Sequence, residues 1–235
     1  MFFGYGIVGL DGFEVAWLDA GEAGGPLCLI REGEIGLVCS EMEQDTAGSR
    51  ESMRLYTDVL CGMIKRTTIV PLRFGTLFDD EEQIIANLRQ GAGTYKKLLA
   101  RLAGQIEVEL KVWWKKEGFE QTIMANKRLS RWKKALENNI GLGYDVVEFG
   151  KAVQAVADAE REKLAKLFLA RLRPLATDHV LKEATDEFQA FDAVFLVSRS
   201  KEAEFDHAVG VLYDREPGKY IFKYTGPWAP HHFIT

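Results

Sequence analysis

The sequence lacks long apolar runs and a cysteine framework. No run approaches the roughly 18 apolar residues that a membrane-spanning helix needs, so we expect no membrane association. The three cysteines, Cys28, Cys39 and Cys61, are odd in number and widely spaced, which predicts reduced thiols and neither disulfides nor a CxxC metal site. The opening residues 1–6 lack the charged and apolar regions of a signal peptide. We therefore expect a cytoplasmic protein.

Positive charge is also scarce. Lys and Arg total 30 against 35 Asp and Glu, giving a net charge of −5 and a pI near 5.5. Nucleic-acid binding needs clustered basic residues, so this balance argues against nucleic acid as the main partner. With 47% hydrophobic and 28% charged residues, a chain of 235 residues can bury the cores of two domains.

Catalytic signatures are missing as well. None of the serines stands in a GxSxG setting, and no local signature supplies a base to a cysteine. Gly4–Gly9 spells GxGxxG, but these glycines lie inside the first expected strand, so we interpret the match as chance. His231 and His232 are adjacent and would point to opposite sides of an extended tail, which disfavours a shared metal ion. We expect no enzyme activity, no metal and no cofactor.

The first half alternates strands and helices. Apolar runs predict strands, a Gly-containing turn at 31–34 predicts a hairpin, and the acidic residues 79–82 predict a helix start. Gly91 and Gly93 are expected to break that helix. The expected strands are 4–10, 15–18, 27–30, 35–40, 68–74 and 106–114. The expected helices are 52–66, one that begins within 79–82 and continues through Leu88, and 95–102. Because crossover helices would return the chain to one sheet, we predict a ferredoxin-like α/β sandwich over residues 1–116.

The second half has more helix. Apolar periodicity predicts helices over 119–138, 145–173 and 201–213, with strands at 192–198 and 220–224. The fold class is therefore α+β with two domains. The first is the ferredoxin-like sandwich, and the second, over 117–225, is a helix-rich α+β domain with a small antiparallel sheet. An extended C-terminal tail covers 226–235.

Two segments could carry binding. The stretch 111–134 interleaves basic residues with Trp113, Trp114 and Trp132, a combination that single-stranded nucleic acid can use. We favour the alternative in which Trp132 faces the core and the charges are solvated. Arg73 follows an apolar strand and precedes Phe74 and Gly75, so it is expected to pin the turn through a carboxylate while Gly75 permits a positive φ.

Several motifs, in order along the chain, resemble the gas vesicle protein F/L family. The two specific ones are Val70-Pro71-Leu72-Arg73-Phe74-Gly75-Thr76 and Tyr224-Thr225-Gly226-Pro227-Trp228. The opening Tyr5-Gly6-Ile7 and the alternating strand with Glu107 and Lys111 support them. The chain departs from the family pattern at Arg54-Leu55-Tyr56-Thr57, where family members often have a His, and at His231-His232, where they tend to have a Tyr.

The resemblance implies a non-enzymatic gas vesicle assembly or minor structural protein. It implies binding to the small, hydrophobic main shell protein, with other gas vesicle accessory proteins as further partners, and we favour the first domain as the docking surface. The alternative is a small-ligand or nucleotide-sensing protein on ferredoxin-like domains. The structural or interaction candidates are Arg73, Phe74, Gly75, Trp113, Trp114, Tyr224, Gly226, Pro227 and Trp228.

Overall fold

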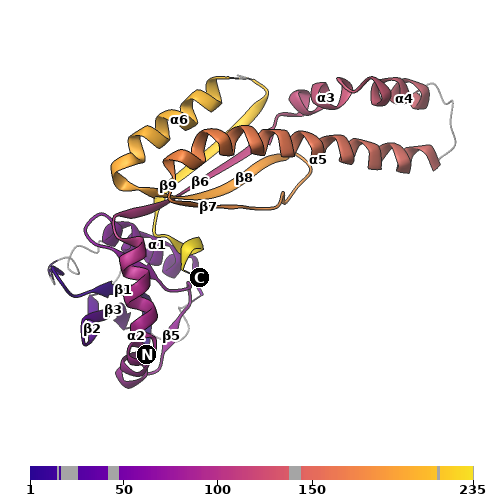
Figure 1. Ribbon diagram of the computed structural model, residues 1–235. Helices are drawn as coiled ribbons and strands as arrows, with labels where there is room; N and C mark the ends of the chain where they lie inside the picture. Colours follow the sequence, from indigo (N-terminus) through magenta and orange to yellow (C-terminus); the bar gives the residue numbers. More distant parts are fainter. Residues whose placement is uncertain (15, 17–25, 42–47, 138–143, 216–217, 235) are drawn as a thin grey trace. The chain divides into compact units, whose positions relative to one another are not determined.

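The computed structural model describes all residues except 15, 17–25, 42–47, 138–143, 216–217 and 235 (Figure 1). The chain is α+β, with two small antiparallel sheets. It divides into two compact units. Unit 1 comprises Met1–Val108, Leu196–Ser200 and Gly226–Thr235, and unit 2 comprises Glu109–Phe195 and Lys201–Thr225. The boundaries expected from the sequence, at 116 and 225, differ from this division. The first segment of unit 1 ends at Val108, and unit 1 also includes Gly226–Thr235 at the end of the chain.

The first sheet has the strand order β2-β3-β1-β4, with β5 also pairing with β1. Its strands are β1 (Phe2–Gly9), β2 (Leu27–Glu32), β3 (Ile35–Glu41), β4 (Ile69–Pro71) and β5 (Leu77–Phe78). The predicted hairpin is present: β2 pairs antiparallel with β3, and Gly33 takes a φ of 60° in the turn between them. The expected strand at 15–18 falls mostly outside the described residues.

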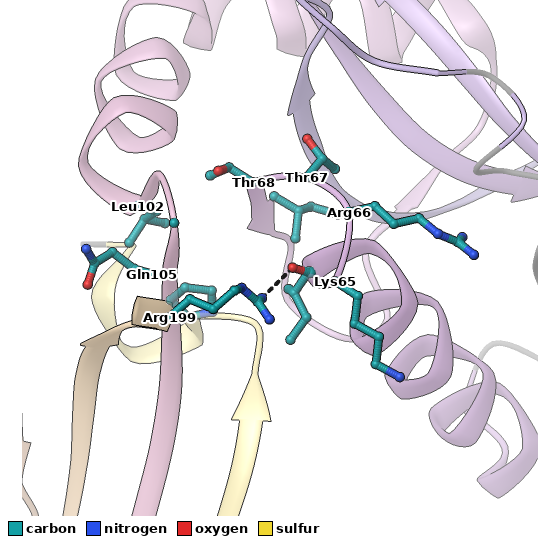
Figure 2. A pocket seen from close by; sticks show the side chains of 11 residues that line it. Lys65, Arg66, Thr67, Thr68, Leu102, Gln105 and Arg199 are labelled. Atoms are coloured by element: carbon teal, nitrogen blue, oxygen red, sulfur yellow. Dashed lines mark hydrogen bonds between the residues drawn. The ribbon is translucent and has the colours of Figure 1, made fainter. Parts of the chain in front are cut away.

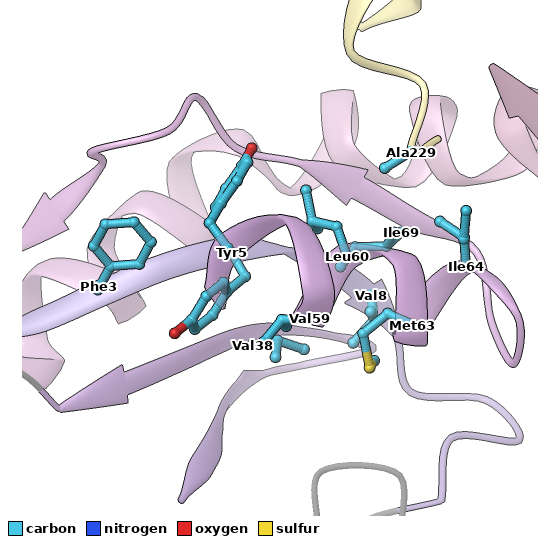
Figure 3. Close-up of a cluster of buried hydrophobic side chains, with 11 residues drawn as sticks. Phe3, Tyr5, Val8, Val38, Val59, Leu60, Met63, Ile64, Ile69 and Ala229 are labelled. Atoms are coloured by element: carbon cyan, nitrogen blue, oxygen red, sulfur yellow. The ribbon is translucent and has the colours of Figure 1, made fainter. Parts of the chain in front are cut away.

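Two helices bury this sheet. Helix α1 (Arg50–Ile64) begins at Ser49, whose hydroxyl accepts the Ser52 N–H at 3.0 Å. Its apolar face packs on Phe3, Tyr5 and Val8 of β1 to form the cluster drawn in Figure 3. Helix α2 (Glu81–Leu102) contributes a second set of buried residues, including Ile84 and Leu88, and contacts the strands of the same sheet. Because β1 and β3 are buried along nearly their whole length, both faces of the sheet are covered.

Helix α2 corrects one prediction. The acidic start is confirmed, because Asp80 accepts the Gln83 N–H at 2.9 Å. Gly91 and Gly93 do not break the helix, which continues to Leu102. At Gly91 the absent side chain leaves room for the Tyr95 ring, whose Cε2 lies 2.3 Å from where a Cβ would stand. The Tyr95 hydroxyl reaches Asn87 at 2.9 Å, so the ring lies along the helix.

The second sheet has the order β7-β8-β6-β9. Its strands are β6 (Gln105–Trp114), β7 (Asp178–Leu181), β8 (Gln189–Ser198) and β9 (Tyr220–Trp228). The alternating strand predicted at 106–114 is confirmed, but it belongs to this sheet and not to the first, because alternation reports a half-buried strand and not its partner. Strand β7 was not predicted, and β9 runs beyond residue 224.

The helices of unit 2 pack on one another and on this sheet (Figure 1). Helices α5 (Tyr144–Leu172) and α6 (Glu202–Asp214) contribute Phe168 and Phe205 against rings of β8 and β9. The single helix predicted over 119–138 is instead two helices, α3 (Lys116–Met124) and α4 (Lys127–Glu137). The break occurs where Asn126 accepts the N–H groups of Arg128 and Leu129, which starts a new helix.

The element order β6, helices, β7, β8, α6, β9 is the β-α-β-β-α-β order of ferredoxin-like folds. The first sheet has the corresponding strand order. Along the path β2-β3-β1-β4, as along β7-β8-β6-β9, the strand that comes first in the chain lies between the third and the fourth, and the second is at the edge. The connection between β1 and β2 falls largely outside the described residues. A ferredoxin-like first domain therefore stays a prediction.

Candidate functional site

The first motif of the resemblance forms the turn between β4 and β5. The Arg73 carbonyl accepts the Thr76 N–H at 3.1 Å and the Thr76 hydroxyl at 2.6 Å, while the Arg73 side chain is exposed. Gly75 has a φ of 82°, as expected from its position in the motif. The turn is thus held by the backbone of Arg73, whereas the sequence pointed to its guanidinium.

Phe74 turns inward from this motif. Its ring lies 5.8 Å from Phe3 and 5.4 Å from Tyr56 between ring centroids, both edge-on. The Tyr56 hydroxyl donates to the Leu72 carbonyl, and burial raises the pKa of Tyr56, so this phenol stays protonated as a donor. The motif therefore adds the Phe74 ring to the aromatic side of the unit 1 core.

The second motif belongs to the end of β9. Gly226 has a φ of 139°, and a Cβ there would lie 2.9 Å from a Val108 methyl and 3.0 Å from the Glu107 carbonyl, so only glycine fits. The Gly226–Pro227 peptide bond is cis. Pro227 and Trp228 are half-buried, whereas Ala229 and Phe233 are 3% and 2% exposed. The tail of the chain is thus anchored in unit 1 by Ala229 and Phe233 more than by Trp228.

Two histidines and a buried glutamate fix this tail. Glu107, with a side chain 5% exposed, accepts the His232 N–H at 2.9 Å and lies 2.7 Å from His232 Nδ1. The neighbouring His231 lies 3.4 Å from the Tyr56 hydroxyl through Nε2. Burial, and then the nearby His232, lower the pKa of His231. The two rings therefore have different partners, His231 the Tyr56 hydroxyl and His232 the Glu107 carboxylate.

Trp113, Trp114 and Tyr224 are engaged within unit 2. Trp113 Nε1 donates to Asp186 at 3.0 Å. Trp114 is buried against Phe119, and the Arg161 guanidinium lies 5.4 Å from the centre of its ring. The Tyr224 hydroxyl donates to Asp206 at 2.7 Å, and burial with that carboxylate raises the pKa of Tyr224. These contacts make the three side chains packing residues.

In the basic stretch 111–134, the charged side chains of α4 are solvated, which is the alternative that we favoured from the sequence. Helix α4 turns Leu129 and Trp132 toward α5, where Trp132 meets Phe149 edge-on at 5.7 Å. The basic side chains of α4, including Lys133 and Lys134, are exposed. The Trp132 ring is covered by Phe149 and by the Arg128 guanidinium, which lies 5.8 Å from its centre, so this ring is already packed and is not free to stack on a base.

Lys111, part of the family resemblance, belongs to an ionic network on the second sheet. Its ammonium lies 3.2 Å from Glu109 and 3.7 Å from Asp192, and Lys182 bonds Glu109 at 2.7 Å. Burial raises the pKa of Asp192 against the opposing attraction of the two lysines. The two amines balance the two carboxylates, so the network ties β6 to β8 and to Lys182, the residue that follows β7.

A pocket of about 300 Å³ in unit 1 lies at the C-terminal ends of α1 and α2 (Figure 2). Arg199 Nη2 donates to the Ile64 carbonyl at 2.5 Å, and its N–H donates to the Gly104 carbonyl at 2.9 Å. Figure 2 shows Lys65 and Arg66 extending away from Arg199. Phosphates bind at the positive N-termini of helices, whereas these are the negative ends, so Arg199 acts as a helix cap and the pocket does not favour a nucleotide.

Most of the exposed apolar side chains lie in unit 2. Among the described residues, every large exposed hydrophobic except Met53 and Leu77 lies there; these are Val146, Val147, Val180, Leu181, Val211, Tyr213 and Ile221. A groove of about 310 Å³ between α5 and α6 is lined by Leu167, Ala170, Arg171, Val211, Leu212 and Arg215. Sequence reasoning missed this groove, although Val211 and Tyr213, which flank Leu212 of the predicted apolar face, are a signal that could have indicated it.

Among the described residues, no group of three or more His, Cys, Asp or Glu side chains could hold a metal ion. Within the same part of the chain, every helix is too short or too polar to cross a membrane.

Comparison with known proteins gives consistent matches. The model of the family described as "Gas vesicle synthesis protein GvpL/GvpF" matches residues 2–235. Gas vesicle protein F of Dolichospermum flosaquae is 26% identical over 167 residues, 70% of this chain and 68% of that protein. Gas vesicle protein F of a Streptomyces species (strain CB03234) is 22% identical over 89% of this chain and 88% of that protein.

Solved structures share the fold. The crystal structure of the gas vesicle protein GvpF from Anabaena sp. PCC7120 aligns with a TM-score of 0.87 at 21% identity, covering 100% of this chain and 98% of that one. The structure of GvpF from Microcystis aeruginosa aligns with a TM-score of 0.79 at 18% identity and the same coverage. With the family match over nearly the whole sequence, the chain belongs to the gas vesicle synthesis protein GvpL/GvpF family.

Proposed function

We propose that this protein binds the hydrophobic main shell protein of gas vesicles and promotes vesicle assembly without chemical turnover. Family membership supports the link to gas vesicles. The single observation that carries the binding proposal is the set of exposed apolar side chains in unit 2. An apolar subunit needs a partner that covers its surface before it assembles, and exposed apolar patches are typical of such partner surfaces.

We favour the groove between α5 and α6 as the docking surface, because exposed Val211 lines it beside further apolar side chains. Leu167, Ala170, Val211 and Leu212 supply an apolar floor, and Arg171 and Arg215 lie at its margin. An apolar segment of the shell protein that carries a carboxylate would match both features. This surface lies in unit 2, whereas the sequence led us to favour the first domain.

The test is a co-expression pull-down of the full chain with the main shell protein from the same source. Val211→Asp places a charge in the groove, and Met53→Asp, at a similarly exposed position on α1, is the matched control. The two side chains are 42% and 47% exposed, so neither substitution should unfold the protein. We expect Val211→Asp to lose the shell protein and Met53→Asp to retain it.

Other results would change the proposal in different ways. Loss in Met53→Asp with retention in Val211→Asp would move the docking surface to unit 1. Failure of the unmodified chain to retain the shell protein, with both proteins expressed, would overturn binding itself. The full chain is used because unit 1 needs residues 196–200 and 226–235.

A further inference from the structure

Two cysteines face each other across the β2–β3 hairpin. Cys28 and Cys39 are direct partners in the antiparallel register, and their sulfur atoms lie 3.1 Å apart. Directly paired residues of antiparallel strands have Cα atoms about 4.5–5.5 Å apart, within the range that a disulfide spans. The two thiols can therefore be joined without moving the backbone.

The two thiols differ in access and in chemistry. Cys39 is completely buried, whereas Cys28 is partly exposed on the edge strand β2. The hydrogen bond from Cys39 lowers the pKa of Cys28, while that same bond and burial raise the pKa of Cys39. An oxidant from solvent thus reaches Cys28 first, and Cys39 is the thiol beside it.

We propose that Cys28 and Cys39 form a reversible oxidation site, in which a hydroperoxide converts the two thiols to a disulfide that locks edge strand β2 onto β3. This proposal is independent of the shell-protein proposal. The sequence predicts reduced thiols, and the cysteines are free in the structure. The proposal adds an oxidised state that Cys28 and Cys39 reach only when a hydroperoxide is present.

The reaction balances in two steps. The Cys28 sulfur attacks the hydroperoxide, the O–O bond breaks, and a sulfenic acid and an alcohol form, or water when the oxidant is hydrogen peroxide. The Cys39 sulfur then attacks the Cys28 sulfur, the S–O bond breaks, and water leaves as the S–S bond forms. Two thiols are oxidised and one hydroperoxide is reduced.

In the test, the folded full chain is treated with hydrogen peroxide and then unfolded, and its free thiols are alkylated. The mass of the intact protein is then measured by mass spectrometry. We expect the loss of two of the three alkylatable thiols, so the oxidised chain takes up one alkyl group where the reduced chain takes three, and recovery of all three after dithiothreitol. Cys61→Ser should still lose two thiols. Cys28→Ser and Cys39→Ala should not form an intramolecular disulfide.

Three outcomes would overturn the proposal. The first is a disulfide that forms equally well in Cys28→Ser, and the second is a covalent dimer through Cys61. The third is three unchanged thiols after an exposure that fully oxidises glutathione. Circular dichroism of each variant before oxidation shows whether Cys39→Ala still folds, and Cys28→Ser, at the more exposed position, tests the site if it does not.

Discussion

At the scale of single residues, a buried carboxylate in unit 1, that of Glu107, is joined to the tail. Glu107 is nearly inaccessible to water, yet both of its oxygens are engaged by His232, one by the backbone N–H and one by the ring. A buried carboxylate is stable only with such partners. One side chain of β6 therefore holds the end of the chain in place.

Glu107→Gln should weaken this attachment. The amide keeps the shape and one acceptor oxygen but loses the charge that strengthens both bonds, so we expect the free energy of unfolding to fall by about 1–2 kcal/mol. Urea denaturation measures this loss. Glu120→Gln, on the exposed surface of α3, is the control and should leave the midpoint unchanged. Equal midpoints for both variants would contradict the role of Glu107.

The half-buried His231 predicts a pH dependence. Because its pKa is lowered in the folded state, the unfolded chain binds the proton more readily below its usual pKa of 6.5. The stability that this residue contributes is complete above that pH and is lost as the pH falls through it. His231→Phe should therefore lose less stability than the wild type between about pH 7.5 and pH 5.5.

Denaturant titrations at the two pH values measure that difference. His207→Gln, at an exposed position of α6, is the control and should behave as the wild type does. If the free energy of unfolding of His231→Phe falls as much as that of the wild type between the two pH values, groups other than His231 cause the pH dependence.

At the scale of elements, the sequence correctly predicted those helices and strands whose formation depends on residues close together in the chain. The hairpin, the acidic start of α2 and the alternating strand β6 are each specified by neighbouring residues. The sheet to which β6 belongs, the edge strand β7 and the anchoring of the tail depend on partners far along the chain, which periodicity does not identify. The same limit applies to the candidate site, since the groove between α5 and α6 exists only after two distant helices meet.

Gly91 and Gly93 of α2 provide a matched pair for testing how glycine affects the stability of this helix. Both lie inside the helix, but nothing stands within 4 Å of a Cβ on Gly93, whereas a Cβ on Gly91 would collide with the Tyr95 ring. Gly93→Ala should raise the free energy of unfolding by about 0.5–1 kcal/mol through reduced chain entropy. Gly91→Ala should gain less or lose stability, because Tyr95 must leave Asn87.

Thermal unfolding of the two variants decides between these expectations. An equal gain at both positions would show that Tyr95 moves aside at no cost.

At the scale of the whole molecule, the compact units are not continuous stretches of chain. Unit 1 is completed by Leu196–Ser200, which supplies the Arg199 cap of α1, and by Gly226–Thr235, which supplies Ala229 and Phe233. A chain built this way brings its two ends into one core. The first half is thereby coupled to residues that follow the second half in sequence.

A fragment of residues 1–116 should therefore fail to fold cooperatively, although it contains the whole first sheet. It would expose the surface that Ala229 and Phe233 cover, and it would leave Glu107 without His232. Losing a buried Phe alone costs about 3–5 kcal/mol, a large part of the stability of a small domain. Dispersed amide resonances and a sharp urea transition for this fragment would contradict the expectation, whereas recovery of both on adding a peptide of residues 226–235 would show that the tail completes the core.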